Sequence, residues 1–325
     1  MRVRTCGMIA ATLLATCPVA TGADDARFDA VYESSGAATL PDGRVLVVDD
    51  EAGAPLHLMR IDPAGDQPVT SEQRRLQPPR SLGQRWRLGR LDDLEGACSD
   101  AAGRVTVIGS HNLQAGIDET DRRTVARFRV EGDRMSGIEV RRDLRTDLLN
   151  DVPALGAAMR EGGKHDRDLD IEGLACDTRR DRLLIGLRAP RLDERAIVVA
   201  LANPDDWLGG GAEPALERTV LDLDGGGIRA MAYDAVTDGL VLVSRDDTGK
   251  KKRFKAWWQD AAGVSEPIRL KLDDKKMLDD VEGVTVLEDA RHVLFVRDDG
   301  RRDKGRTGSW FVLDRETLGL PGGMR

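Results

Sequence analysis

Residues 170–177 read DIEGLACD, and residues 182–188, after a four-residue turn, read RLLIGLR. The first string opens on Asp-x-Glu-Gly and continues into a short apolar stretch, and the second is apolar almost throughout. Short apolar runs bounded by turn residues are typical of strands that are covered on both faces. The two strings therefore predict a pair of neighbouring strands in a β-rich unit.

The Asp-x-Glu-Gly opening recurs along the chain. It stands at residues 93–96, 170–173 and 280–283, and a looser copy, Gly-Ile-Arg-Ala, stands at residues 227–230. Alignment on the motif glycine or its equivalent (positions 36, 96, 173, 230 and 283) separates the copies by 53 to 77 residues. Such repeats predict an all-β fold, a single β-propeller with five four-stranded antiparallel blades. Six blades are the alternative, because most blades are shorter, about 40–50 residues.

Two further segments complete the predicted domain, which spans residues 24–325. Residues 27–33 (RFDAVYE) are expected to add the outer strand of the last blade and so to close the ring, which removes exposed sheet edges. The second unit is the longest, and four apolar residues in it follow the spacing of one helix face. We therefore expect a short helical insertion near residues 148–160.

Residues 1–23 have the pattern of a secretory signal peptide. Arg2 and Arg4 precede an apolar run at residues 8–15, and small residues at 20–23 offer a cleavage site. The pattern predicts a periplasmic or secreted protein. A lipid anchor on Cys17 is the weaker alternative, since Thr16 is a poor residue before a lipidated cysteine. No other stretch is apolar and long enough to cross a bilayer.

The charge and the cysteines of the mature chain limit its partners and its covalent structure. Removal of residues 1–23, which contain two arginines and no acidic residue, changes the formal net charge from −8 to −10. This balance argues against a nucleic-acid partner, and we expect a monomer. Only Cys98 and Cys176 remain, one position out of register in different units. We expect two buried free thiols rather than a disulfide.

The motif carboxylates are the candidate metal ligands. Aspartate and glutamate two residues apart on a strand point to the same side, so motifs that open the innermost strands would gather at the central channel. Clustered carboxylates raise one another's pKa unless a cation neutralises them, and hard oxygen ligands favour Ca²⁺ or Mg²⁺. No organic cofactor is expected. The predicted metal ligands are Asp93, Glu95, Asp170, Glu172, Asp280 and Glu282.

The same residues admit structural and catalytic interpretations. The carboxylates could instead accept hydrogen bonds or pair with arginines across blades, and Arg229, at a motif glutamate position, would supply such a counter-charge. For acid–base catalysis the candidates are Glu95, Glu172 and His111, the last because histidine titrates near neutral pH. An anionic small-molecule ligand would be held by Arg188, Arg229 and Arg245. These arginines could also merely neutralise the acidic ring.

The strings DLEGACSD, DIEGLACD, RLLIGLRAP and DDVEGVTVL resemble those of an uncharacterised bacterial propeller family that is defined as a domain of unknown function. That family is similar, at a distance, to esterase-like phytase propellers, which share D-x-E-G at blade starts. The resemblance implies acidic side chains arranged around calcium ions that hold phosphate, on the six carboxylates named above. Arg229 departs from that pattern.

Three functions are consistent with these features. The first is a divalent-metal-dependent hydrolase of phosphate or carboxylic esters. The second is a non-catalytic ligand-binding or scaffold propeller. The third is a structural protein that calcium stabilises through the D-x-E-G motifs.

Overall fold

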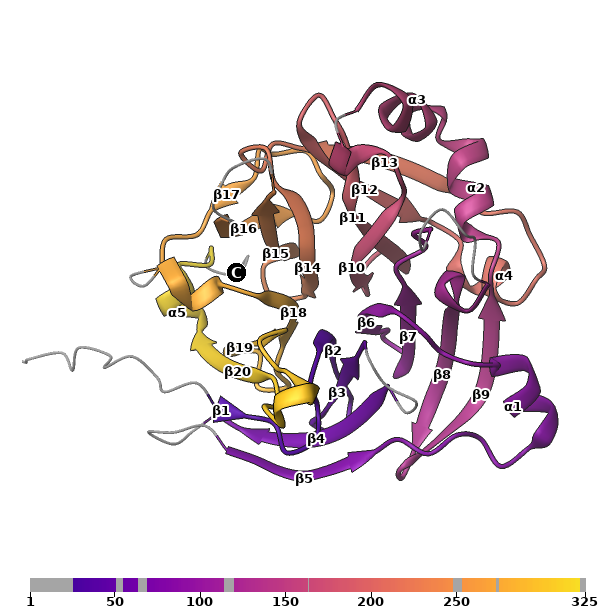
Figure 1. The fold of residues 1–325 in the computed structure, drawn as a ribbon, viewed down its shortest axis with the longest axis vertical. Coiled ribbons are helices and arrows are strands. Elements are labelled where there is room, and N and C mark those ends of the chain that lie inside the picture. Colours follow the sequence, from indigo (N-terminus) through magenta and orange to yellow (C-terminus); the bar gives the residue numbers. More distant parts are fainter. Residues whose placement is uncertain are drawn as a thin grey trace, which may run out of the picture.

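The computed structural model describes residues 26–50, 55–63, 69–113, 120–162, 164–247, 253–272 and 275–321. The chain forms five four-stranded antiparallel sheets arranged as a ring (Figure 1). The predicted five-bladed propeller is therefore confirmed. The proposed signal peptide and Cys17 lie outside the described residues. Within those residues, no helix combines the length and the hydrophobicity needed to cross a membrane.

Each blade runs from the ring axis outward in chain order. The first two blades contain β2 (Ser34–Thr39), β3 (Arg44–Asp49), β4 (Leu56–Asp62) and β5 (Val69–Arg75), then β6 (Leu94–Ser99), β7 (Arg104–Gly109), β8 (Val125–Glu131) and β9 (Arg134–Arg141). The next two contain β10 (Asp170–Asp177), β11 (Arg182–Leu192), β12 (Arg195–Leu201) and β13 (Leu216–Leu221), then β14 (Gly227–Asp234), β15 (Gly239–Asp246), β16 (Arg253–Asp260) and β17 (Ile268–Arg269).

The fifth blade joins the two ends of the chain. It contains β18 (Val281–Val286), β19 (His292–Arg297), β20 (Ser309–Asp314) and, on the outside, β1 (Ala26–Arg27). Ala26 pairs with Trp310 and Arg27 with Ser309, so the predicted closure by an N-terminal strand is confirmed. The strand is shorter than the predicted run, because Phe28 leaves it to pack in the apolar cluster around Trp310.

The motif glycines let the innermost strands meet at the axis. A Cβ added to Gly36 would lie 2.9 Å from the Cα of Gly96, and one added to Gly283 would lie 2.9 Å from the Cα of Gly36. Only glycine permits so close an approach of backbones. The apolar side chains fill the space between neighbouring blades, in five clusters that include the fully buried Phe128, Trp207 and Trp310.

Short helices lie at the rim of the ring (Figure 1). These are α1 (Leu82–Leu88), α2 (Leu144–Asp151), α3 (Pro153–Glu161), α4 (Pro204–Leu208) and α5 (Arg315–Leu318), with 3-10 turns at Thr120–Arg123, Lys164–Asp166, Lys275–Leu278 and Arg302–Lys304. Helices α2 and α3 fill the long connection between β9 and β10. They bury Leu144, Leu148 and Leu155 against the second and third blades.

The expectation of two free thiols is wrong. Cys98 and Cys176 form a disulfide between β6 and β10, with their Cα atoms 5.5 Å apart. The reason is a one-residue stagger between the neighbouring inner strands. A Cβ on Gly96 would meet the Cβ of Leu174 at 2.8 Å, so Gly96 lies opposite the residue after the next motif glycine. The same stagger places Cys98 opposite Cys176.

Candidate functional site

A β-bulge at the motif glutamate position aims one side chain per blade at the axis. In all five innermost strands the register shifts at this position, between Leu94 and Gly96 in the second blade, for example. A bulged residue is left out of the ladder, which re-aims its side chain. The five residues at this position are Ser35, Glu95, Glu172, Arg229 and Glu282. We call them the axial ring.

A second set of side chains lies where the second strand of each blade ends. Each member directly follows the residue that pairs with the inner-strand residue before the bulge. The members are Asp50, Ser110, Arg188, Arg245 and Asp298. We call them the upper ring. The two arginines fall in the third and fourth blades, whereas the two aspartates fall in the first and fifth. The mouth of the channel therefore has a basic side and an acidic side.

On the basic side, the arginines neutralise several candidate metal ligands. Buried Arg229 forms ion pairs with Glu172 and Glu282, both within the axial ring. Arg188 lies 2.7 Å from Glu172 and 3.2 Å from Asp170. These carboxylates have arginine partners, so the structural interpretation accounts for Glu172 and Glu282.

Arg245 completes the basic side of the mouth. Its Nε and Nη2 donate to the two carboxylate oxygens of Asp247, at 2.6 and 3.1 Å, and its Nη1 lies 3.9 Å from Glu282. Arginine beside Asp247 lowers the pKa of that carboxyl, although burial acts in the opposite direction. A hollow of about 50 Å³ lies between these groups and is lined by Asp170, Arg188, Arg191, Gly227, Arg245 and Asp247.

On the acidic side, three carboxylates lie together and share few partners. Asp50, Asp93 and Glu95 each offer an oxygen within 4.8 Å of the others. Asp93 accepts a hydrogen bond from Ser110 and forms an ion pair with Arg122. Glu95 has neither a hydrogen bond nor an ion pair among the described residues. We call Asp50, Asp93 and Glu95 the acidic cluster.

Burial and mutual repulsion perturb the acidic cluster. Burial, followed by the charges of Glu172 and Asp50, raises the pKa of Glu95 well above its ordinary value. Burial and the charge of Asp93 raise the pKa of Asp50 to about 7. A cation placed among these groups would reverse both effects. Their oxygens are of the kind that Ca²⁺ and Mg²⁺ prefer.

Two other carboxylates at the mouth also have raised pKa values. Burial, with the charge of Glu172, raises the pKa of Asp170 to about 7, against the lowering effect of Arg188. Burial raises the pKa of Asp298 to about 6. A second group of carboxylates close enough to share an ion consists of Glu95, Glu172 and Glu282. Asp280, a predicted metal ligand, belongs neither to this group nor to the acidic cluster.

His111 lies below the surface rather than in the channel. Its side chain is fully buried, and Nδ1 lies 2.8 Å from the carbonyl oxygen of Gly109. Burial lowers the pKa of His111 to about 4, and the charge of Arg145 acts in the same direction. Desolvation thus disfavours the charged form of His111, and its role in acid–base catalysis stays a prediction.

Asp50, Asp298 and Arg122 were not among the predicted metal-ligating, catalytic or substrate-binding residues. Asp50 and Asp298 each follow the second strand of a blade, and their amides donate to the carbonyls of Glu33 and Asp280 in the same way. That shared position after a β-strand was the available signal. Arg122 comes from a 3-10 turn, and no repeat in the sequence marks it.

The channel itself is nearly closed. Just inside the axial ring the free space is about 10 Å³ and is bounded by Glu95, Glu172, Glu282, Leu174 and Met231, among others. A larger space, about 110 Å³, lies at the opposite end near the disulfide. A cavity of about 800 Å³ lies on the outer flank of the fourth blade, and none of these carboxylates lines it. A ligand of the candidate site would therefore bind at the mouth.

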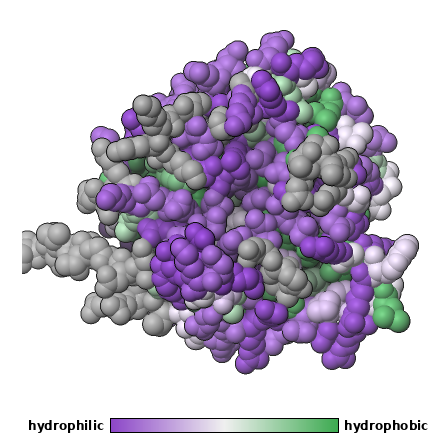
Figure 2. Space-filling model, in the orientation of Figure 1, coloured by the Kyte–Doolittle hydropathy of each residue, from purple (hydrophilic) through white to green (hydrophobic). Residues whose placement is uncertain are grey.

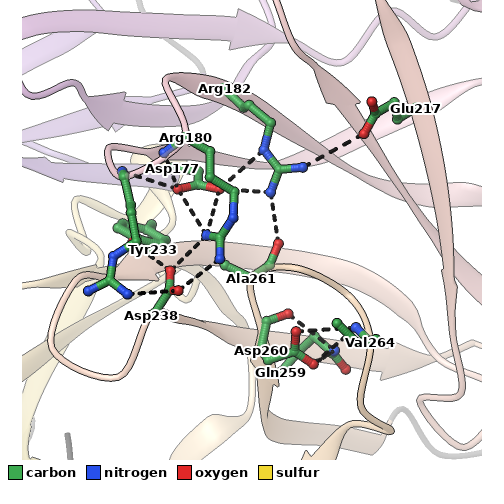
Figure 3. Close-up of polar contacts among 11 residues, drawn as sticks. Asp177, Arg180, Arg182, Glu217, Tyr233, Asp238, Gln259, Asp260, Ala261 and Val264 are labelled. Carbon is green, nitrogen blue, oxygen red and sulfur yellow. Dashed lines mark hydrogen bonds and ion pairs between the residues drawn. The ribbon is translucent and has the colours of Figure 1, made fainter. Parts of the chain in front are cut away.

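At the opposite end of the same inner strands, buried aspartates pair with arginines (Figure 3). Asp238 accepts two hydrogen bonds from Arg180, at 2.7 and 2.8 Å, and one from Tyr233 at 2.9 Å. Arg180 and Arg182 both also donate to buried Asp177. The side-chain hydrogen bond from Arg180 lowers the pKa of Asp238 to about 2. We call this end of the strands the turn end.

Comparisons with known proteins add a family and several distant folds. A solved structure of a protein of unknown function from Bacteroides thetaiotaomicron is 13% identical with a TM-score of 0.40, over 85% of this chain and 56% of that one. A glucose dehydrogenase structure is 13% identical with a TM-score of 0.44, over 89% and 99% of the two chains. At these values neither likeness supports a functional argument. No curated protein matches the chain.

A family model matches residues 87–307, which include all three Asp-x-Glu-Gly motifs and four of the five inner strands. The matched region contains Asp93 and Glu95 but not Asp50. The chain therefore belongs to the family described as protein of unknown function, DUF3616.

Proposed function

We propose that this propeller is a divalent-metal-dependent hydrolase of phosphate or carboxylic esters, and that it acts at the mouth of the channel. One observation carries the proposal: the acidic cluster, with Glu95 buried and without a partner, lies next to a basic side that can hold an anion. Perturbed carboxylates beside a specific charge are frequent at functional sites.

The acidic cluster fits a hard divalent cation. Its three carboxylates converge within 4.8 Å, and Glu95 is an uncompensated buried acid. Asp50, Asp93 and Glu95 would hold Ca²⁺ or Mg²⁺. Such an ion, when bound, polarises an ester and makes a bound water more acidic. Glu172 and Glu282 are poorer ligands because Arg229 already pairs with them.

The basic side supplies substrate binding and proton transfer. The side chain of Arg188 is one-third exposed, so it has N–H donors left for an anionic group after its contacts with Asp170 and Glu172. Asp170, whose pKa is about 7, can hold or release a proton near neutral pH. In this proposal Asp170 takes the acid–base role for which Glu172 was considered, since Glu172 already pairs with Arg188 and Arg229.

The proposal includes the setting of the reaction. We propose a monomer that acts in the periplasm or outside the cell on a small anionic substrate, without a nucleic-acid partner. The predicted signal peptide and the acidic charge of the chain support this part.

The test is thermal unfolding of the chain in EDTA, then with Ca²⁺ or Mg²⁺ restored, followed by aryl phosphates and aryl acetates as substrates with that ion. We expect an ion-dependent rise in melting temperature and ion-dependent turnover, since a ligand that binds only the folded state stabilises it. Glu95→Gln should lose both. Glu217→Gln, the same change on an exposed outer strand, should keep both.

The nearly closed channel favours a second candidate, a non-catalytic propeller that an ion stabilises. An ion-dependent rise in melting temperature with no turnover would support this candidate and contradict the hydrolase. Neither a rise nor turnover would contradict both proposals and leave the motifs as structural ion pairs.

A further inference from the structure

Helix α1 presents two of the three most exposed large apolar side chains of the described part of the chain. The side chain of Trp86 is 89% exposed and that of Leu82 is 80% exposed. They are four residues apart on a helix, so they lie on the same face. In Figure 2, green atoms project at the lower right edge of a mostly hydrophilic surface, where Figure 1 places α1.

The helix is held firmly enough to keep these side chains in place. Ser81 caps its first turn by accepting a hydrogen bond from the amide of Gln84, and Gly89 ends it with a φ of 66°. Leu88 is buried in the core cluster between the first two blades, and Arg142 donates to its carbonyl oxygen at 2.8 Å. The exposure of Leu82 and Trp86 is therefore a property of the folded rim.

The surroundings of these two side chains are basic. The sequence from residue 73 to residue 91 contains six arginines and no acidic residue. Arg80 and Arg87 are exposed and have no hydrogen bond or ion pair among the described residues. Two free guanidinium groups thus flank an exposed tryptophan and leucine, on a chain whose formal net charge is −8. We call Arg80, Leu82, Trp86 and Arg87 the α1 patch.

We propose that the α1 patch binds the surface of an anionic lipid membrane. Tryptophan and leucine on one face of a short helix, with arginines beside them, are the groups that enter the boundary between headgroups and acyl chains. The local positive charge complements anionic headgroups although the whole chain is acidic. The proposal is independent of the hydrolase.

The shape of the patch favours a membrane over a protein partner. Two side chains project from a seven-residue helix at the rim, and neither lines any of the cavities described above. A stable protein interface buries about 800 Å² on each partner, which two protruding side chains do not provide. A bilayer surface requires no complementary shape. Binding through the rim would leave the axial mouth uncovered.

The test is co-sedimentation of the full chain with vesicles of phosphatidylcholine and phosphatidylglycerol (3:1), compared with vesicles of phosphatidylcholine alone. We expect partitioning onto the anionic vesicles at least about tenfold stronger, and weaker in 0.5 M salt. Leu82→Ser/Trp86→Ser should reduce partitioning at least about tenfold. Arg80→Gln/Arg87→Gln should reduce it and remove most of its salt dependence.

Matched controls separate the patch from general hydrophobicity. Val264→Ser changes a residue that is 85% exposed in another blade and should bind as the unmodified chain does. The melting temperatures of all variants should agree, because none of the altered side chains is buried. Equal sedimentation with and without vesicles, undiminished binding by Leu82→Ser/Trp86→Ser, or capture of a protein through α1 without vesicle binding would overturn the proposal.

Discussion

The two ends of the innermost strands treat their carboxylates in opposite ways. Strand β10 begins with Asp170 at the channel mouth and ends with Asp177 at the turn end. At the mouth the pKa of Asp170 is raised to about 7, whereas at the turn end the pKa of Asp238 is lowered to about 2. Burial without sufficient partners causes the first shift, and hydrogen bonds from Arg180 cause the second.

The difference distinguishes carboxylates that stabilise the fold through their partners from carboxylates that do not. At the turn end Asp177, Asp234 and Asp238 each accept hydrogen bonds from an arginine, so their charges contribute to the fold. At the mouth, Glu95 is buried without a partner, and burying an unpaired charge destabilises the folded state. Residues that destabilise the fold are expected mainly at functional sites, where function outweighs their cost in stability. The contrast leads to four predictions.

The largest effect is expected at the turn end. Asp234 is fully buried and accepts two hydrogen bonds from Arg315, at 2.8 and 2.6 Å, and one from Thr237. Asp234→Ala leaves Arg315 without its partner and should lower the free energy of unfolding by about 3–5 kcal/mol in urea denaturation. The exposed pair Arg301–Asp303 is the control, where Asp303→Ala should leave the free energy of unfolding nearly unchanged because solvent screens the pair. Equal losses would remove the contrast.

The disulfide, which also lies toward the turn end, should have the next largest effect. It links residues that are 78 positions apart. Cys98→Ser/Cys176→Ser should lower the free energy of unfolding by about 2–4 kcal/mol, since the bond restricts the unfolded chain. The unmodified chain in reducing buffer should show a similar loss. A double variant as stable as the oxidised chain would contradict this prediction.

At the mouth, removal of the Glu95 carboxylate should not lower the free energy of unfolding. In EDTA, Glu95→Gln should leave the free energy of unfolding unchanged or raise it by up to about 1 kcal/mol, because the variant keeps the shape and removes a carboxyl whose charged form burial and acidic neighbours disfavour. Glu172→Gln is the matched variant in the same ring. It should lose about 2–3 kcal/mol, because Arg188 and Arg229 lose a charged acceptor. Destabilisation by both variants would show that Glu95 is paired in solution.

The smallest effect is a dependence on pH. The pKa of Asp50 is raised to about 7 in the folded chain, so the folded state binds its proton more tightly than the unfolded state does. The resulting stability is fully present below pH 4 and is lost as the pH rises through about 7. In EDTA the melting temperature should be several degrees lower at pH 8 than at pH 5.

Asp50→Asn is the variant that tests the origin of this pH dependence, and its melting temperature should change less over the same range. The turn end should respond in the opposite direction. Asp238, with a lowered pKa, loses its stabilising effect only as the pH falls from about 4 through 2. A melting temperature that rises from pH 5 to pH 8 would contradict the raised pKa values at the mouth.

The repeat spacing was sufficient to predict the fold, because every blade needs the same short strands and the same close approach at the axis. The closing strand followed from the requirement that no edge stay open. The disulfide could not be predicted from the positions of the cysteines relative to Gly96 and Gly173. Those positions do not show that the two inner strands are offset by one residue. That offset comes from how the blades pack, and no single blade encodes it.

The site was only partly predictable for a related reason. The motif identified Asp93 and Glu95, and it identified Arg229 as a counter-charge. It could not show that Arg229 pairs with Glu172 and Glu282 rather than with Glu95, since that depends on which side chains of the ring point toward one another. The burial of His111 could not be predicted either, because the local sequence does not report it.

The pairing of Ala26 with Trp310 constrains the order in which the ring can form. The strands of the fifth blade come from two segments far apart in the sequence, β1 and β18 to β20, so this blade cannot form until β20 has been synthesised. Blades one to four can form as they emerge, each from its own continuous sequence. Until β20 is synthesised, β1 has no strand to pair with, and the incomplete ring has open sheet edges with which another copy could pair. Newly made chains can therefore pair with other copies in this way until β20 has been synthesised.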